Sequence, residues 1–219
     1  MIKKYIDAAI SRNQCDIVLK NARYVDVFCG KVRKGDIAIY EDRIVGIGKY
    51  RAKRIFDLEG KYVLPGFIDA HVHIESSKLS PEGYACLVVP RGTTTVIADP
   101  HEIVNVCGAD GAEYIVKAAQ NTPLDVNVML PSCVPATPFE TGGAEISGED
   151  TAKIIAENTF FGLGEFMNYP DVIAADGEAV KKLQAAYAAG KPCDGHAPSV
   201  HGKALNAYLC GGITTDHEC

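Results

Sequence analysis

The feature that most constrains the fold is a regular alternation of strand-like and helical segments that begins after Pro65. Helix signals include Ser80-Pro81 before one segment and Gly190, with Pro192 just beyond it, after another. Apolar, strand-like runs are predicted at residues 66–70, 93–98, 125–130, 160–164, 191–194 and 212–215. Strand then helix, repeated about every 20 to 35 residues, predicts a parallel sheet built from βα units.

Two folds fit this alternation: a doubly wound open sheet and a (β/α)8 barrel. A doubly wound dinucleotide binder normally has a glycine-rich fingerprint after its first strand. The first strand here, in GFIDAHVHIES (66–76), ends instead in His71 and His73. Residues i and i+2 of a strand project from the same side, about 7 Å apart, so these two imidazoles can converge on one metal ion.

Residues that bind metals or move protons follow five of the six predicted strands. His71 and His73 follow the first strand. The second strand is followed by Asp99, His101 and Glu102, the fourth by Glu165, the fifth by Asp194 and His196, and the sixth by Asp216, His217 and Glu218. Among the 6 histidines only His201 lies away from a strand end. In a barrel the carboxyl ends of all strands face one opening, so the pattern favours the barrel and predicts a metal site at that opening. The third strand is followed by prolines and small hydroxyl residues, which suit a loop that shapes the substrate site.

The ligand types indicate the chemistry. Imidazole nitrogens together with carboxylate oxygens suit a divalent transition metal such as Zn, Fe or Mn rather than Ca or Mg. A bound metal lowers the pKa of water from 15.7 to about 7. The expected reaction is therefore hydrolytic attack on a polarised carbon.

Composition narrows the partners. The chain has 219 residues, a net charge of −6 and no run rich in Lys or Arg, which argues against nucleic acid or an anionic membrane and favours a small molecule. Residues 1–13 are charged throughout, so they predict a short amphipathic helix rather than a signal peptide. The 8 cysteines include no CxxC pair and are interpreted as reduced thiols of a cytoplasmic protein.

Two domains are predicted. Residues 1–64 combine the amphipathic helix with a small antiparallel β module, since residues 16–63 alternate apolar positions between turn signals such as Cys29-Gly30 and Glu59-Gly60. Residues 65–219 form the barrel domain.

Several motifs carry a resemblance to a known family. PGFIDAHVHIESS resembles the first-strand signature of the amidohydrolase superfamily. ADPHEIVNV, MLPSCVPATPFE, GLGEFMNYP, DGHAP and TTDHE are similar to segments of the adenine deaminases within it. The likeness runs from the N-terminal helix to the last residue, with the motifs in the same order.

This resemblance implies a binuclear centre of divalent ions, Mn or Fe first and Zn as a further candidate. It places His71 and His73 on one ion, His196 and His217 on the other, and Glu165 as the bridge. Relatives that hydrolyse cyclic amides usually bridge with a carboxylated lysine from the fourth strand, and this fourth strand has no lysine. The resemblance therefore favours hydrolysis of adenine to hypoxanthine and ammonia over a cyclic amidase of the dihydroorotase or hydantoinase type.

The same resemblance assigns roles around the metals. Glu102 is expected to protonate the purine ring, for which its pKa would have to be raised. His101 and Asp99 are candidate catalytic residues beside it. Ser132, Pro135 and Asp194 are candidate substrate-binding residues.

The family continues through two further barrel strands, the last with a catalytic Asp, and a C-terminal domain. The expectation is thus an N-terminal portion with about six of eight barrel strands and an incomplete β module, inactive alone and homo-oligomeric in its full-length form. A non-catalytic assembly subunit is the alternative of a different class.

Overall fold

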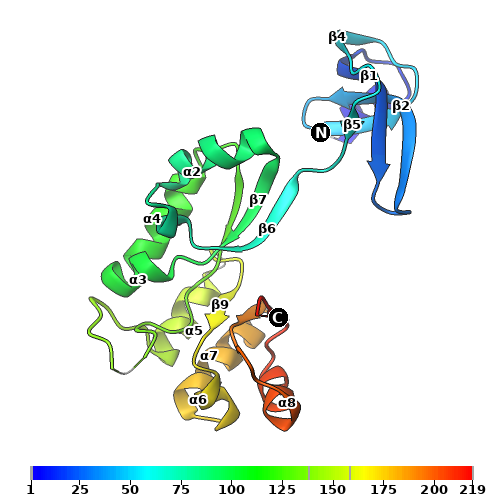
Figure 1. The fold of residues 1–219 in the computed structure, drawn as a ribbon. Coiled ribbons are helices and arrows are strands. Elements are labelled where there is room, and N and C mark those ends of the chain that lie inside the picture. Colours follow the sequence, from blue (N-terminus) through cyan, green and yellow to red (C-terminus); the bar gives the residue numbers. More distant parts are fainter. Residues whose placement is uncertain (1, 138, 158, 219) are drawn as a thin grey trace. The chain divides into compact units, whose positions relative to one another are not determined.

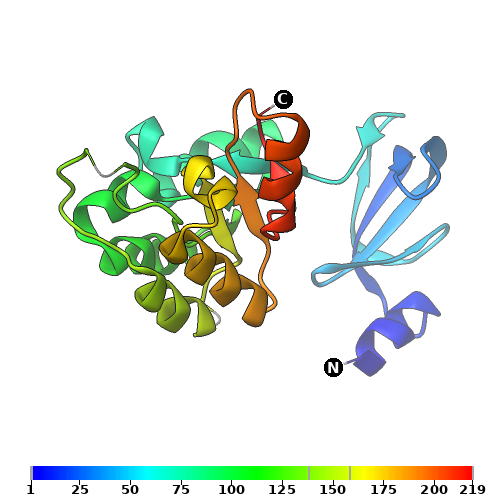
Figure 2. The same cartoon turned by 90° about the horizontal axis from the view of Figure 1, so that it is seen from below.

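The computed structural model describes residues 2–137, 139–157 and 159–218. The chain divides into two compact units, Met1–Pro65 and Gly66–Cys219 (Figures 1 and 2). None of the helices in these described ranges combines the length and apolar character needed to cross a membrane.

The first unit is a helix packed on a mixed sheet. Helix α1 (Ile2–Ala9) is followed by the strands β1 (Cys15–Asp26), β2 (Lys31–Tyr40), β3 (Arg43–Ile47), β4 (Ala52–Asp57) and β5 (Tyr62–Val63). The order is β3-β2-β1-β4, with β5 also paired to β1. Buried Ala8, Cys15, Val18 and Ala38 form its core, and the Tyr50 hydroxyl donates to the carbonyl of Ala9 at 3.0 Å.

The expectation of an antiparallel module is right for three strands and wrong for two. Strands β1, β2 and β3 pair antiparallel, as tight turns between neighbours require. Strands β4 and β5 pair with β1 in parallel. The chain leaves β3 at one edge and crosses the sheet to reach the far side of β1, so β4 arrives in the direction of β1.

The second unit contains six parallel strands in sequence order. They are β6 (Phe67–Val72), β7 (Thr93–Ala98), β8 (Asp125–Val128), β9 (Leu163–Phe166), β10 (Cys193–Gly195) and β11 (Thr215–Asp216). Sheets β6-β7-β8 and β9-β10-β11 are joined by a single parallel bridge between Leu130 and Leu163. This arrangement is an incomplete (β/α)8-type barrel, so the predicted fold class is confirmed.

Helices connect these strands. They are η1 (Ile74–Ser77), α2 (Pro81–Val88), η2 (Val89–Arg91), α3 (His101–Cys107), α4 (Ala109–Ala119), α5 (Gly148–Ala156), α6 (Tyr169–Ile173), α7 (Gly177–Ala188) and α8 (Gly202–Cys210). Ser80 caps α2 with Pro81 in its first turn, Ser147 and Asp150 form a capping box on α5, and Asp176 caps α7. These caps are the sequence signals that locate the helices.

The core of this unit lies between the sheet and its helices. Leu130, Leu163, Phe166 and Tyr208 are each at most 2% exposed. Figure 1 shows α2 and α4 beside β7. In chain order α5 follows β8, α6 and α7 follow β9, and α8 follows β10. Apolar packing thus holds the strands while their carboxyl ends stay polar.

Candidate metal centre

Glu165 lies at the centre of the polar strand ends. It is the third residue of β9, a fully buried strand, and is only 4% exposed. Its Oε1 atom lies 3.3 Å from His73 Nε2 and 3.7 Å from His101 Nδ1. One carboxylate oxygen therefore faces two imidazoles from β6 and α3.

The other carboxylate oxygen faces three more imidazoles. Glu165 Oε2 lies 2.9 Å from His196 Nδ1, 3.3 Å from His217 Nε2 and 3.9 Å from His71 Nε2. The His71 and His217 rings stack with centroids 3.8 Å apart. His71 thus falls between the two groups, since its Nε2 is also 3.2 Å from His73 Nε2.

The spacing of these nitrogens fits shared metal ions. Metal–nitrogen bonds of about 2.0–2.1 Å place neighbouring ligands about 3 to 3.4 Å from one another. His71 Nε2 and His73 Nε2 are 3.2 Å apart, and His196 Nδ1 and His217 Nε2 are 3.1 Å apart. Candidate ligand atoms within 4.8 Å of one another come from His71, Glu165 and His217, from His73, His101 and Glu165, and from His196, His217 and Glu218.

The second nitrogen of each β6 histidine is held by an acceptor. The backbone carbonyl of Asp99 lies 2.6 Å from His73 Nδ1, and Asp194 Oδ2 lies 3.0 Å from His71 Nδ1. A proton on Nδ1 leaves the Nε2 lone pair free, which is the tautomer that a metal requires. Both imidazoles are therefore oriented as ligands.

Ionisation of the centre follows its contacts. The hydrogen bond to Glu165 raises the pKa of His73 to about 9 despite burial. Burial opposes ionisation of Glu165, but the His73 hydrogen bond and the nearby imidazoles outweigh it and lower its pKa to about 2. Without a metal, Glu165 is thus a carboxylate that holds a proton on His73.

Asp194 is buried, and its carboxylate faces the imidazoles of His71 and His217. Its Oδ2 contacts His71 and lies 3.5 Å from His217 Nδ1, and its Oδ1 accepts a hydrogen bond from Thr215 at 2.7 Å. Burial raises its pKa, but the bonds from His71 and Thr215 lower it to about 2. Its carboxylate orients two imidazoles, so its placement suits positioning of ligands.

Asp99 and Ser132 hold the backbone of Glu165 from both sides. Asp99 is 1% exposed, and its Oδ2 accepts from the Glu165 backbone N–H at 2.7 Å. The Ser132 hydroxyl, which is fully buried, donates to the Glu165 carbonyl at 2.6 Å. Gly164 permits the Asp99 contact, because a Cβ there would lie 2.3 Å from the carboxylate.

Glu102 lies at the edge of the centre, where its Oε2 is 3.6 Å from His73 Nδ1. The role assigned to Glu102 needs a raised pKa, and its surroundings shift the pKa in the other direction. Burial favours the neutral form, but the Ser76 hydroxyl and the neighbouring His73 charge lower the Glu102 pKa. The adjacent carboxyl of Glu75 has its pKa raised instead, chiefly by burial, and the two acids are hydrogen-bonded to each other.

A cavity adjoins the loop after β8. Ser132 and Pro135 line it together with Phe166 and Lys182, and its volume is about 560 Å³. The Lys182 ammonium donates to the Ser132 carbonyl at 2.8 Å. The two residues predicted to shape the substrate site thus share one hollow, which contains no histidine among its described lining residues.

Sequence reasoning missed two residues that support the centre. The buried Tyr208 hydroxyl accepts from the His196 N–H at 2.9 Å and donates to the Phe166 carbonyl at 2.8 Å. Tyr208 lies in α8, where no motif marks it. Glu75 lies two residues after His73, within the first-strand motif, and could have been recognised from the sequence. His201 stays outside the cluster, exposed at the start of α8.

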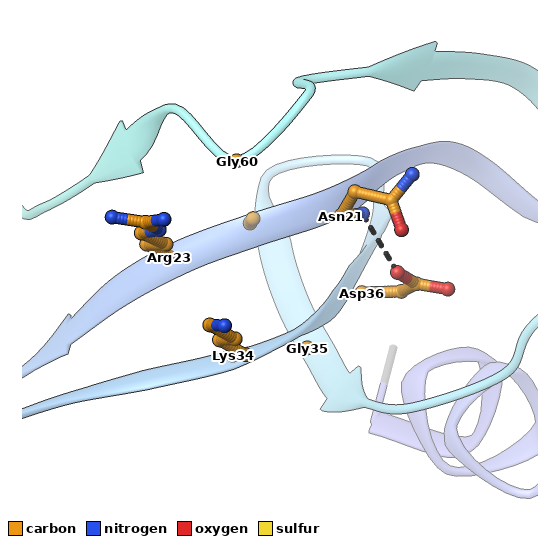
Figure 3. Close-up of a pocket in the computed structure, with 7 residues that line it drawn as sticks. Asn21, Arg23, Lys34, Gly35, Asp36 and Gly60 are labelled. Carbon is orange, nitrogen blue, oxygen red and sulfur yellow. Dashed lines mark hydrogen bonds between the residues drawn. The ribbon is translucent and has the colours of Figure 1, made fainter.

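A second hollow lies in the first unit. It has a volume of about 350 Å³ and is lined by Arg23, Lys34 and neighbouring residues of β1, β2 and the turn before β5 (Figure 3). The Asn21 backbone N–H donates to Asp36 at 2.9 Å within it. Its described lining residues include one carboxylate, that of Asp36, and no histidine or cysteine.

Comparison with known proteins agrees with this geometry. Adenine deaminase 2 of Desulfotalea psychrophila is 54% identical over 218 residues, which are 100% of this chain and 38% of that protein. Adenine deaminase of Clostridium acetobutylicum is 53% identical over the same length, again with 38% of that protein covered. The chain therefore spans about 38% of the length of these curated relatives.

Solved structures show the same fold at low identity. A zinc-complexed N-acyl-D-glutamate deacylase of Bordetella bronchiseptica has a TM-score of 0.65 at 17% identity, covering 93% of this chain and 51% of that one. N-isopropylammelide isopropylaminohydrolase of Burkholderia multivorans has a TM-score of 0.60 at 16% identity, covering 91% and 60%. The amidohydrolase family matches residues 62–219, and this chain belongs to that family.

Proposed function

We propose that the protein is an adenine aminohydrolase that converts adenine to hypoxanthine and ammonia. The observation that carries this proposal is the identity of 53% and 54%, across all of this chain, with proteins named adenine deaminase. The site supports it, because Glu165 rather than a lysine lies between the imidazoles.

The imidazoles of His71, His73, His196 and His217 together with Glu165 would hold two divalent ions, with Glu165 between them. We propose Mn or Fe as the native metal, with Zn as a further candidate, because imidazole and carboxylate donors suit all three. When bound, such ions supply Lewis acidity and an activated water at neutral pH. The proposed domain division at residues 64 and 65 puts every one of these ligands in the second domain.

Other side chains around the centre would donate a proton, position the ligands and bind the substrate. Glu102 would protonate the purine ring, since its half-exposed carboxylate lies at the edge of the centre. Its pKa is lowered by its surroundings, so bound substrate would have to raise that pKa for this role. Asp99 would keep Glu165 in place through its backbone N–H. Ser132 and Pro135 would shape the substrate cavity, while the Asp194 carboxylate, already engaged by His71 and Thr215, would orient ligands rather than touch substrate.

The remaining expectations are proposals of the same kind. The 7 described cysteines are all free, which supports a reducing, cytoplasmic location. Adenine as the small-molecule partner follows from the proposed activity. We also propose that the protein forms a homo-oligomer. The net charge of −6 favours the absence of a nucleic acid or membrane partner.

The test is ammonia release by the full-length protein loaded with Mn or Fe under reducing conditions. We expect ammonia from adenine and none from dihydroorotate or hydantoins. Glu102→Gln should lose activity by about 10²- to 10⁴-fold, the usual contribution of a general acid, and keep its metal content. Ammonia from a cyclic amide and none from adenine would overturn the proposal.

A further inference from the structure

His101 lies in a helix rather than in a strand, and its side chain is buried. It is the first residue of α3, directly after Asp99-Pro100, and is 8% exposed. Neither of its ring nitrogens has a hydrogen-bond partner within the described chain. Buried imidazole nitrogens without a hydrogen bond are unfavourable, so this arrangement favours a further partner at the ring.

The nearest polar atom to His101 is also without a hydrogen bond. Asp99 Oδ1 lies 2.7 Å from His101 Nδ1, yet both atoms remain unpaired among the described residues. The two atoms are close but not aligned as donor and acceptor. Two acceptor atoms this close repel each other, and a cation held beside them by His101 would relieve that repulsion.

Further donors complete the set around His101 Nδ1. Glu165 Oε1 lies 3.7 Å away, and His73 Nε2 lies 3.3 Å from that same oxygen. One ligand atom from each of His73, His101 and Glu165 falls within a 4.8 Å group. The three come from α3 and from the ends of β6 and β9, so the backbone presents them from three directions.

We propose that His101 is itself a metal ligand, binding through Nδ1 the ion that His73 and Glu165 Oε1 hold. The centre then has a ligand outside the strand-end histidines, contributed by the helix that follows β7. This inference rests on the proposed metal centre and is independent of adenine as the substrate. It assigns His101 to the metal rather than to proton transfer.

The experiment loads the metal-free full chain with Co(II) and compares it with His101→Gln. We expect two ions per chain in the unaltered protein. In His101→Gln the weaker ion should lose at least about 100-fold in affinity, beyond most outer-shell effects, and the visible Co(II) bands should shift. His201→Gln, which removes an exposed histidine outside the cluster, should leave stoichiometry and spectrum unchanged.

A second variant covers loss of folding. His101→Asp keeps a donor atom at this position, so it should hold both ions with an altered spectrum, and circular dichroism should show native helix content. Two tightly bound ions and an unchanged Co(II) spectrum in either variant would overturn the inference. Absence of metal from the unaltered chain would instead overturn the proposed metal centre, so the two failures are distinguishable.

Discussion

Metal binding should release a proton at neutral pH, because a proton occupies one of the ligands when no metal is bound. The Glu165 carboxylate raises the pKa of His73 to about 9, so at pH 7 nearly every His73 carries a proton on the nitrogen that faces Glu165. One pKa unit corresponds to about 1.4 kcal/mol. The two units between pH 7 and 9 therefore lower the apparent metal affinity about 100-fold, or about 3 kcal/mol.

Raising the pH from 7 to 9 should strengthen metal binding but weaken the contribution of His73 to the stability of the metal-free chain. Metal affinity should rise about tenfold per pH unit from pH 7 to 9 and then level off. The His73 proton stabilises the metal-free fold fully below pH 6.5, and this contribution disappears as pH rises through about 9. Glu165, with a pKa lowered to about 2, stabilises it above pH 4.5 and loses that contribution as pH falls toward 2.

Calorimetric titration with Mn(II) in buffers of different ionisation enthalpy counts the protons released. We expect at least one proton per chain at pH 7, and fewer above pH 9. Nuclear magnetic resonance of the metal-free chain should show the His73 pKa returning toward 6.5 in Glu165→Gln, while His201→Gln leaves it unchanged. An affinity that does not vary between pH 7 and 9, with no proton released, would refute the reasoning.

Three further predictions follow from single contacts. Glu165→Gln should lower the metal content below two ions per chain, and elemental analysis showing two would argue against a bridge. Gly143→Ala should destabilise the fold by about 1 to 3 kcal/mol, because a Cβ there would lie 2.4 Å from the Val106 carbonyl oxygen. The control Gly177→Ala, where a Cβ would have nothing within 4 Å, should be neutral or stabilising. Equal midpoints of urea unfolding for the two variants would contradict this prediction. Tyr208→Phe removes the hydroxyl that bonds two backbone groups, so the free energy of unfolding should fall by about 1 to 3 kcal/mol. An unchanged free energy of unfolding would show that these two hydrogen bonds do not stabilise the fold.

The second unit was predictable in outline because its signals are local. Apolar runs placed six strands near their observed positions, and cap and breaker residues located the start of α2 and the end of α7. Helices α3, α6 and α8 were missed, since α3 and α6 lie within segments interpreted as strand ends or loops and no cap or breaker signal was recognised for α8. The parallel pairing of β4 and β5 with β1 was missed as well, because strand direction depends on the crossover and not on alternation.

The candidate centre shows the same division between local and non-local information. The His-x-His pair and Glu165 stood out by residue type and position at strand ends. The lowered pKa of Glu102 was not predictable, because it depends on the Ser76 hydroxyl and on the neighbouring charge of His73. Tyr208 was invisible for a similar reason, since only the folded chain brings α8 against the backbone of His196.

Polar side chains at the strand ends connect short strands to one another in addition to their backbone pairing. Strands β9, β10 and β11 have only 4, 3 and 2 residues. Three backbone hydrogen bonds join the segments of β8 and β9, from Phe161 to Val128, from Leu130 to Gly162 and from Gly164 to Leu130. Side chains connect these ends across the sheet instead: Asp99 after β7 and Ser132 after β8 bond the backbone of Glu165, and Asp194 of β10 bonds His71 of β6. Because the same contacts orient the metal ligands, ions bound at Glu165 would add to the backbone pairing of these short strands, and metal binding and folding of this edge should be coupled.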